Sequence, residues 1–375
     1  MKHAVERRFG PSQGVRVFRA PGRVNLIGEH TDYNLGFVLP IALELACLVA
    51  RAPAADGLLR VYSEETGEER TCPVEQIAGF TPAHHWSDYV AGVARELARA
   101  GYRIEPQSLY IRSSVPVGGG LSSSAALLVS SALALSADQP IAPLALAELC
   151  QRAEVGFVGL PCGIMDPYIS IFGREHTALE IDCRTLRHVA VPLPEGIEIV
   201  AVNTMVKHQL GDSAYRKRTQ ECAAASTVIG VQSLRDANPR SLEQCAAMLD
   251  GVVFRRARHV ISENDRVQQF SAGARAGDAT AMGRLLVESH RSLQHQYEVS
   301  CEELDFLVDA ALAVEGVYGA RMTGGGFGGC TVNLMRQGSG ENFAAEISRA
   351  YHERFGVIPR IYNCRPAAGA GEISQ

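Results

Sequence analysis

The sequence predicts a globular chain that mixes helices and strands and divides into two domains. Its 375 residues are enough for two domains of ordinary size, and a hydrophobic fraction of 46% supplies a sizeable core. Segments that alternate apolar and polar residues are typical of strands, and segments with apolar residues three and four apart are typical of helices. Both kinds recur along the chain. A proline-rich turn at residues 192–196 marks the expected domain boundary.

The charge and cysteine patterns argue against several classes of protein. The 36 basic and 41 acidic side chains give a net charge of −5 that is not concentrated in one block, which argues against nucleic acid or an anionic membrane as a partner. No apolar run reaches about eighteen residues, so we expect no transmembrane helix, and the charged start of the chain does not resemble a secretory signal. The ten cysteines are dispersed without a CxxC pair, which predicts reduced thiols in a cytoplasmic protein.

A polar loop lies between two strand-like segments, residues 15–27 and 36–50. The first strand carries Arg23, and the loop brings Glu29, His30 and Asp32 together. Carboxylate and imidazole groups in one loop are suited to bind the hydroxyls of a small polyol one by one. A solvated turn after a strand is the alternative that this segment leaves open when it is taken alone.

A glycine-rich turn follows the strand-like segment at residues 109–116, and small and apolar residues through Ala137 then predict a helix. A strand, a glycine turn and a helix in succession direct free backbone N–H groups at an anion. Serine hydroxyls at the helix start can bind phosphate oxygens or a magnesium ion. The residues concerned are Gly118, Gly119, Gly120, Ser122, Ser123 and Ser124. A glycine turn with serine helix caps is the alternative.

Two further segments carry possible site residues. Asp166 stands directly before Pro167, which predicts an aspartate N-cap followed by a proline in the first helical position. Residues 321–334 contain five glycines in six positions between two strand-like segments. Alone, this second glycine segment favours a flexible hairpin, but two glycine turns beside strands suit a nucleotide held between two domains.

The other expected elements are read from periodicity. We expect strands at residues 58–63 and 197–203, and helices at 86–100, 141–155, 254–264 and 281–296, with a long helix that begins near residue 207. Trp86 stands at the start of one of these helices, where a lone aromatic side chain is typically a core anchor.

Together these segments resemble a family of small-molecule kinases that contains galactokinase, homoserine kinase, mevalonate kinase and phosphomevalonate kinase. The first motif resembles the galactokinase signature itself: Gly22-Arg23-Val24-Asn25-Leu26-Ile27-Gly28-Glu29-His30-Thr31-Asp32-Tyr33-Asn34. The two glycine segments resemble the other two motifs of the family. The resemblance spans nearly the whole chain and includes Arg152-Ala153-Glu154, Pro161-Cys162-Gly163-Ile164-Met165-Asp166, Ser289-His290-Arg291-Ser292-Leu293 and Tyr297-Glu298-Val299-Ser300-Cys301.

The resemblance implies a fold and an activity. The implied fold is α+β, with mixed sheets and packed helices in two domains, residues 1–190 and 191–375, and the active site in the cleft between them. The implied activity is ATP-dependent phosphorylation of the anomeric 1-hydroxyl of galactose. By resemblance, Asp166 lies beside that hydroxyl and Arg23 lies close to Asp166. Phosphoryl transfer needs a group that accepts or orients the hydroxyl proton and a positive charge near the phosphoryl oxygens.

The resemblance also assigns binding residues. The implied sugar contacts are Glu29, His30, Asp32, Gly163 and Tyr215. The implied nucleotide contacts are Trp86, near the adenine, and Gly118, Gly119, Gly120, Ser122, Ser123 and Ser124. For Mg²⁺ the implied ligands are Ser124 and Glu154, although a solvated acid on a helix is an alternative for Glu154.

One residue departs from the family pattern, because Pro167 stands where the family usually has glutamine. This substitution puts substrate preference or turnover in question more than the fold. Two alternative functions stay open by resemblance: a kinase of N-acetylgalactosamine or a pentose, and a catalytically silent regulator that binds galactose and ATP. The glycine-serine loop is intact here, whereas catalytically silent relatives typically have lesions in it, and this argues against the regulator. We expect a small-molecule sugar and ATP as partners, and a monomer or weak homodimer.

Overall fold

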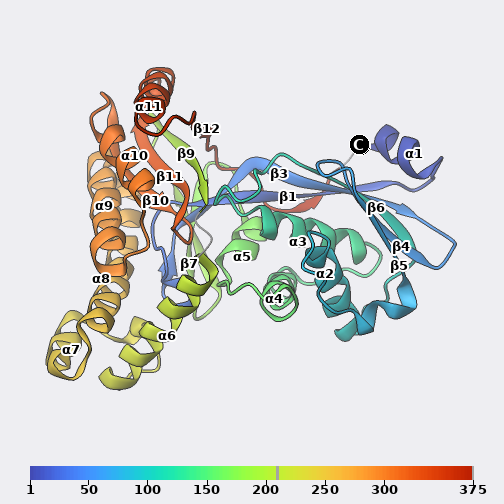
Figure 1. Ribbon diagram of the computed structural model, residues 1–375, viewed down its shortest axis with the longest axis horizontal. Helices are drawn as coiled ribbons and strands as arrows, with labels where there is room; N and C mark the ends of the chain where they lie inside the picture. The colour runs from blue at the N-terminus through green and yellow to red at the C-terminus, as the bar shows by residue number, and fades with distance from the viewer. Residues whose placement is uncertain (208–210, 374–375) are drawn as a thin grey trace.

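The computed structural model describes residues 1–207 and 211–373 and places two groups of sheets and helices side by side (Figure 1). A six-stranded sheet organises the first group. Its strand order is β13 (Gly371–Glu372), β1 (Arg16–Asn25), β3 (Pro40–Pro53), β6 (Gln107–Ser113), β4 (Leu58–Ser63) and β5 (Glu69–Pro73). All neighbours are antiparallel except β4 and β6, which are parallel.

Helices cover one face of this sheet, as Figure 1 shows below β1 and β3. They are α2 (Asp88–Arg99), α3 (Ser123–Leu135), α4 (Pro143–Ala153) and α5 (Met165–Phe172). The α3 helix is apolar on nearly all sides and packs against β1 and β3, so it lies in the centre of the core. This burial fixes the start of α3, and with it the glycine turn that precedes the helix.

Smaller elements complete the first half. The α1 helix (Lys2–Phe9) packs on β3 and β6, and the η2 turn (Val74–Gly79) connects β5 to α2. A three-stranded sheet is formed by β2 (Phe37–Val38), β7 (Thr177–Asp182) and β8 (Arg187–Pro192). The polar loop contains the 3-10 helix η1 (Asp32–Asn34), and the π-helix η3 (Glu154–Val158) extends α4.

The second half contains an antiparallel four-stranded sheet in the order β10 (Val317–Thr323), β11 (Gly328–Arg336), β9 (Ile197–Lys207) and β12 (Arg360–Asn363). The α10 (Glu302–Leu312) and α11 (Gly340–Phe355) helices share a hydrophobic core with this sheet. The remaining helices lie at the left and lower left in Figure 1: α6 (Gly211–Ile229), α7 (Pro239–Gln244), α8 (Gly251–Ala276) and α9 (Ala279–Ser292). Short turns η4 (Leu234–Asp236) and η5 (Ala246–Met248) connect α6, α7 and α8, and the π-helix η6 (Leu293–Tyr297) follows α9.

The end of the described chain returns to the first half. The β12 strand pairs with β9 of the four-stranded sheet. The following residues cross back, and β13 pairs with β1 of the six-stranded sheet. The first and last described segments therefore pack together.

The expected helix start at Asp166 is wrong by two residues. The α5 helix begins at Met165 after Ile164, so Asp166 is the second helical residue and its side chain does not cap the helix. Pro167 occupies the third position, where its missing N–H costs no helical hydrogen bond because the first four N–H groups of a helix have no partner within it. The Asp166 carboxylate is therefore available for other contacts.

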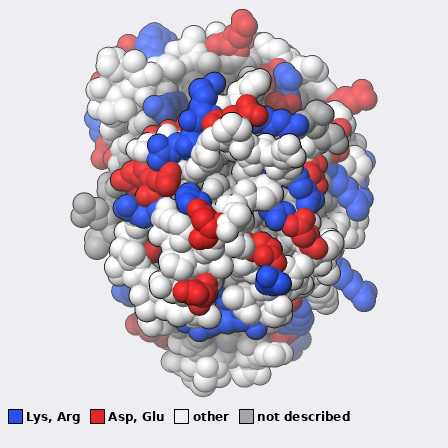
Figure 2. All heavy atoms as spheres, turned by 90° about the vertical axis from the view of Figure 1, so that its right-hand side faces the viewer, with Lys and Arg blue, Asp and Glu red and all other residues white. Residues whose placement is uncertain are grey.

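Charges of both signs are interspersed over the face of the molecule near α1 and β5 (Figure 2). One of the ion pairs of these elements joins Arg8 to Glu69 at 2.6 Å. Among the described residues, no helix has the length and apolar character needed to span a membrane.

Candidate active site

A pocket of about 210 Å³ lies where the polar loop, the segment before α5 and the second glycine segment meet. Its walls include seven residues predicted from the sequence: Arg23, Glu29, His30, Asp32, Gly163, Asp166 and Tyr215. Tyr215 comes from the second half of the chain, as do two further wall residues, Gly324 and Gly325. The tertiary structure thus brings the predicted catalytic and sugar residues into one pocket between the two halves.

A larger hollow of about 600 Å³ lies elsewhere, where residues 192–199 and 363–366 cross between the halves. None of the predicted site residues lines it. The volume of a pocket does not by itself identify an active site. We therefore place the candidate active site in the smaller pocket, where ionisable groups converge.

An ion pair between Arg23 and Asp166 forms the reactive end of the pocket. Arg23 Nε donates to Asp166 Oδ1 at 2.8 Å, and Nη2 donates to Oδ2 at 2.7 Å. Ser122 Oγ donates a short hydrogen bond to the same Oδ2. The remaining guanidinium nitrogen, Nη1, donates to the Gly120 carbonyl at 2.6 Å. The carboxylate is thus held by three donors, and a lone pair of Oδ1 remains for a ligand hydroxyl.

Ser122 adopts an unusual backbone conformation to make this contact. Its φ and ψ angles are 60° and 49°, in the left-handed region that non-glycine residues rarely occupy. Such strain is typical of functional sites. Here it joins the glycine loop to Asp166, so the expected anion site and the expected catalytic pair are in direct contact.

Asp32 and Gly163 fit each other closely on another wall of the pocket. A Cβ atom placed on Gly163 would lie 1.5 Å from Oδ2 of Asp32. Burial raises the pKa of Asp32 to about 7, partly offset by a hydrogen bond from the backbone of Tyr33, and the nearby Asp166 raises it further. Hydroxyl groups of a ligand would stabilise the charged form by donating to this carboxylate.

The His30 imidazole is buried and neutral. Burial lowers the pKa of His30 to about 3, and the nearby His259 and Arg218 lower it further. Its Nδ1 lies 2.8 Å from the hydroxyl of Tyr33. The ring of Tyr215 lies 5.6 Å from the His30 ring, so the aromatic side chain forms a wall beside the imidazole.

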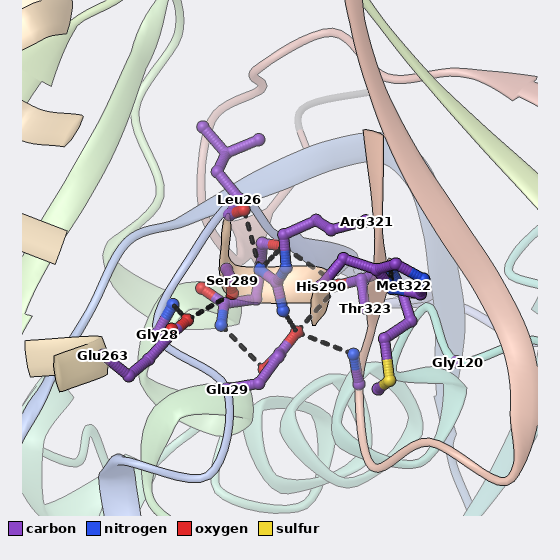
Figure 3. A network of polar contacts seen from close by, with 12 residues as sticks. Leu26, Gly28, Glu29, Gly120, Glu263, Ser289, His290, Arg321, Met322 and Thr323 are labelled. Carbon is purple, nitrogen blue, oxygen red and sulfur yellow. Dashed lines mark hydrogen bonds and ion pairs between the residues drawn. The ribbon is translucent and has the colours of Figure 1, made fainter. Parts of the chain in front are cut away.

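Glu29 is held by a network that joins the two halves (Figure 3). Its Oε1 accepts from Thr323 Oγ1 at 3.0 Å and from the Gly324 N–H at 2.7 Å, and lies 3.0 Å from Nη2 of the fully buried Arg321. Its Oε2 accepts from Asn25 Nδ2 at 2.8 Å. Arg321 also donates to the Leu26 carbonyl at 2.7 Å. Glu29 therefore lines the pocket, and its hydrogen bond to the Gly324 N–H also holds Gly324 at the pocket wall.

The two glycine segments contact each other. A Cβ atom on Gly324 or Gly329 would lie within 4 Å of Gly120, and the Cys330 thiol donates to the Gly119 carbonyl at 2.7 Å. A Cβ atom on Gly119 would lie 2.8 Å from Nδ2 of Asn203, so the Asn203 side chain would have to move to admit it. The contact places the second segment over the turn that precedes α3.

Glu154 and Ser124 offer oxygen atoms that fit a divalent cation. Ser124 is in the first turn of α3 and donates to Glu154. Burial raises the pKa of Glu154 to about 7, and the nearby Asp166 raises it further. A buried carboxylate beside a second carboxylate is stabilised by a cation, and Mg²⁺ prefers such oxygen ligands together with water and phosphate oxygens. The solvated alternative for Glu154 is wrong, because only 5% of the residue is exposed.

Family models match three parts of the chain. Residues 6–53 match the galactokinase galactose-binding signature, residues 88–174 the N-terminal domain of GHMP kinases and residues 270–353 their C-terminal domain. Galactokinase from Roseiflexus sp. (strain RS-1) is 43% identical over 379 residues, which cover 98% of this chain and 96% of the relative. Human galactokinase is 43% identical, with coverage of 98% and 95%.

The chain belongs to the galactokinase family. A galactokinase structure points to the same fold: that of the Lactococcus lactis enzyme complexed with galactose has a TM-score of 0.95 at 32% identity and covers 99% of this chain and 98% of the other. The mevalonate kinase of Methanococcus jannaschii, at 17% identity and a TM-score of 0.72, shares the fold. The expected α+β kinase fold and the expected family are therefore confirmed.

The sequence-based prediction and the pocket differ in two ways: Trp86 was predicted but lies apart from the pocket, and five residues of the pocket wall were not predicted. Trp86 is not a wall of the pocket; its indole donates to Glu68 at 2.8 Å, and its ring packs against the main core. Sequence reasoning did not assign five wall residues: Pro161, Cys162, Met165, Gly324 and Gly325. Three of these belong to the Pro-Cys-Gly-Ile-Met-Asp segment and two to the second glycine segment, so their motifs were the available signal.

Proposed function

We propose that this chain transfers the γ-phosphoryl group of ATP to the 1-hydroxyl of D-galactose, with Asp166 and Arg23 at the reacting atoms. One observation carries the assignment of the residues. The Arg23–Asp166 pair lines the sugar pocket, and through Gly120 and Ser122 it also binds the glycine loop. A hydroxyl and a phosphate group that occupy these two sites would meet at this pair.

Asp166 and Arg23 have different roles in the proposed reaction. Asp166 Oδ1 accepts the hydrogen bond of the sugar hydroxyl and orients its oxygen for in-line attack. Arg23 keeps N–H groups on Nη1 and Nη2 beyond those used by Gly120 and Asp166, and they face the charge that develops on the transferred phosphoryl group. The backbone N–H groups of Gly118, Gly119 and Gly120 and the hydroxyls of Ser122, Ser123 and Ser124 bind the phosphates.

The opposite side of the pocket recognises the sugar. The Asp32 carboxylate accepts hydrogen bonds from two adjacent hydroxyls, while Glu29 and His30 bind the exocyclic hydroxyl. Gly163 leaves the space that Asp32 needs, and the Tyr215 ring covers the sugar. Specificity then comes from polar groups that a sugar with a different hydroxyl pattern would leave unpaired.

We propose Mg²⁺ as the cation that accompanies ATP, held on the protein by Ser124 and Glu154. When bound, the ion neutralises charge on the phosphate oxygens. Support comes from the buried carboxylate of Glu154 beside the Ser124 hydroxyl. We assign Trp86 to the adenine by family resemblance.

We further propose domains at residues 1–190 and 191–375, a cytoplasmic location, and a monomer or weak homodimer. The unpaired state of all ten cysteines, each in the described ranges, supports a reducing compartment. The β13 strand, at the end of the described chain, pairs with β1 of the proposed first domain although it follows the second domain in sequence.

Phosphate transfer from ATP to galactose, glucose, talose and N-acetylgalactosamine tests the activity. We expect galactose 1-phosphate as the main product, identified by mass and by the position of the phosphate. A folded protein that is inert toward galactose and active on another of these sugars would overturn the substrate. Asp166→Ala should reduce kcat by orders of magnitude while galactose binding stays measurable by calorimetry, and near wild-type turnover would remove Asp166 from the reaction.

A further inference from the structure

A row of hydrogen-bonding groups leads from the interior of the protein to the sugar pocket. Cys222 Sγ lies 3.1 Å from the hydroxyl of Tyr297, which lies 2.7 Å from the hydroxyl of Tyr33. The Tyr33 hydroxyl lies 2.8 Å from Nδ1 of His30. The last nitrogen, His30 Nε2, is buried and has no hydrogen-bond partner in the part of the chain that the structure describes.

His30 is the one member of this row that lines the pocket. A neutral imidazole carries a proton on one nitrogen and a lone pair on the other, so the partner of Nδ1 decides what Nε2 offers to a ligand. If Nδ1 accepts from Tyr33, Nε2–H is a donor. If Nδ1 donates to Tyr33, Nε2 is an acceptor.

The chemistry at the His30 end of the row favours the first arrangement. Proton donation can run from the Cys222 thiol through the hydroxyls of Tyr297 and Tyr33 to His30 Nδ1, which leaves the His30 Nε2–H as the one hydrogen of the row that is free for a ligand. The link to Cys222 is weak in either direction, because a thiol is a weak donor and its sulfur is a weak acceptor. A phenol that donates to an imidazole nitrogen is the stronger bond, and each of these buried groups gains from being paired.

The rings around the row hold it in place. Tyr297 is fully buried, and its ring lies 4.5 Å from that of His259 and 4.8 Å from that of His30. The His259 ring is fixed by Ser292 Oγ, 2.8 Å from Nδ1. The hydroxyl of Tyr297 therefore has little freedom to leave the row.

We propose that Tyr33, oriented by Tyr297 and Cys222, fixes His30 in the tautomer that carries its proton on Nε2, so that His30 donates a hydrogen bond to an oxygen atom of the bound sugar. This inference rests on the proposed function for the nature of the ligand. Tyr33, Tyr297 and Cys222 are positioning residues. Because these residues make His30 a hydrogen-bond donor, the sugar must present a hydrogen-bond acceptor to His30.

The tautomer can be measured without any substrate. Nitrogen-15 NMR of histidine-labelled protein, with the His30 signals assigned by comparison with His30→Asn, should show protonated Nε2 and unprotonated Nδ1. Tyr33→Phe keeps the ring and removes the hydroxyl, and we expect a mixture of both tautomers in that variant. A proton on Nδ1 of His30 in the wild-type protein would overturn the proposal, and so would an unchanged spectrum in Tyr33→Phe.

Substrate analogues give a second readout. Fluorine at the exocyclic position of galactose accepts a hydrogen bond but cannot donate one, whereas the 6-deoxy sugar does neither. A donor at His30 predicts that the wild-type enzyme prefers the 6-fluoro sugar to the 6-deoxy sugar in kcat/KM by about three- to tenfold. In Tyr33→Phe and Tyr297→Phe the two analogues should become nearly equal.

The matched control is Tyr62→Phe, which removes a tyrosine hydroxyl from β4, away from the pocket, and should keep the wild-type ratio. Equal rates for the two analogues in the wild-type enzyme, or an unchanged preference in Tyr33→Phe, would overturn the donor role of His30. If galactose itself is not a substrate, the proposed function fails and the NMR measurement still decides the tautomer.

Discussion

Gly163 should be indispensable because its missing side chain makes room for Asp32. A Cβ atom on Gly163 would lie 1.5 Å from Oδ2 of Asp32 and 2.2 Å from its Cγ, so in Gly163→Ala the carboxylate must leave its place in the pocket. Gly163 is not among the glycines with positive φ, so the expected effect is steric and not a backbone preference. The change should therefore act on sugar binding more than on folding.

The size of the effect follows from the contacts that Asp32 loses. Hydrogen bonds to a charged group contribute about 1.5–3 kcal/mol each, and the loss of two at the lower value is about 3 kcal/mol. This corresponds to an increase of about 150-fold in the KM for galactose if KM follows the dissociation constant. The KM for ATP should stay close to that of the wild type, because no residue of the glycine loop lines the pocket that Gly163 lines.

Steady-state kinetics with each substrate varied in turn would test this prediction. The matched control is Gly156→Ala, in the preceding π-helix η3, where a new Cβ atom meets nothing within 4 Å. That variant should keep both KM values, and thermal unfolding should show that both proteins are folded. An unchanged KM for galactose in Gly163→Ala, or an equal rise in both KM values, would refute the reasoning.

Three more predictions concern the ionisable groups. Raising the pH from about 6 to about 8 should lower the KM for galactose about tenfold, because the pKa of Asp32 is near 7 and only its charged form accepts hydrogen bonds from two hydroxyls. In Asp32→Asn the KM for galactose should no longer depend on pH over this range. If the pH dependence is unchanged in that variant, another group is responsible for it. Arg321→Met should reduce the free energy of unfolding by about 3–5 kcal/mol, because the Glu29 carboxylate stays buried without its guanidinium partner. The double variant Arg321→Met/Glu29→Gln should recover part of this loss, which thermal unfolding would measure. No recovery in the double variant would contradict the pairing of Arg321 with Glu29. Glu154→Gln should raise the Mg²⁺ concentration needed for half-maximal activity without changing the KM for galactose, whereas a change confined to the sugar would remove Glu154 from the cation site.

The sequence predicted most of the local structure and most of the pocket. The strand at residues 58–63 is β4 as expected, and the helix expected at 86–100 is α2, because periodicity reports which side of an element faces the core. The seven catalytic and sugar residues also meet as the family resemblance implied. Six of these residues, all except Tyr215, lie in short motifs, where the chemistry of the side chains and their spacing are visible together.

The tertiary structure decided the contacts between distant segments. Residue spacing placed Asp166 at a helix cap, but Arg23 and Ser122 bind its carboxylate instead, and the helix begins at Met165. The hydrogen-bond row behind His30 joins residues 30, 33, 222 and 297, which no local pattern relates.

What the sequence by itself determined is which chemical groups are available and in which local elements they stand. Propensity and periodicity depend on neighbours along the chain, so they carry that information. What only the tertiary structure decided is which partner each buried polar group has, such as Arg321 for Glu29 and Tyr33 for His30. The physical reason is that a buried polar group must be paired, and its partner is chosen by packing across the whole chain.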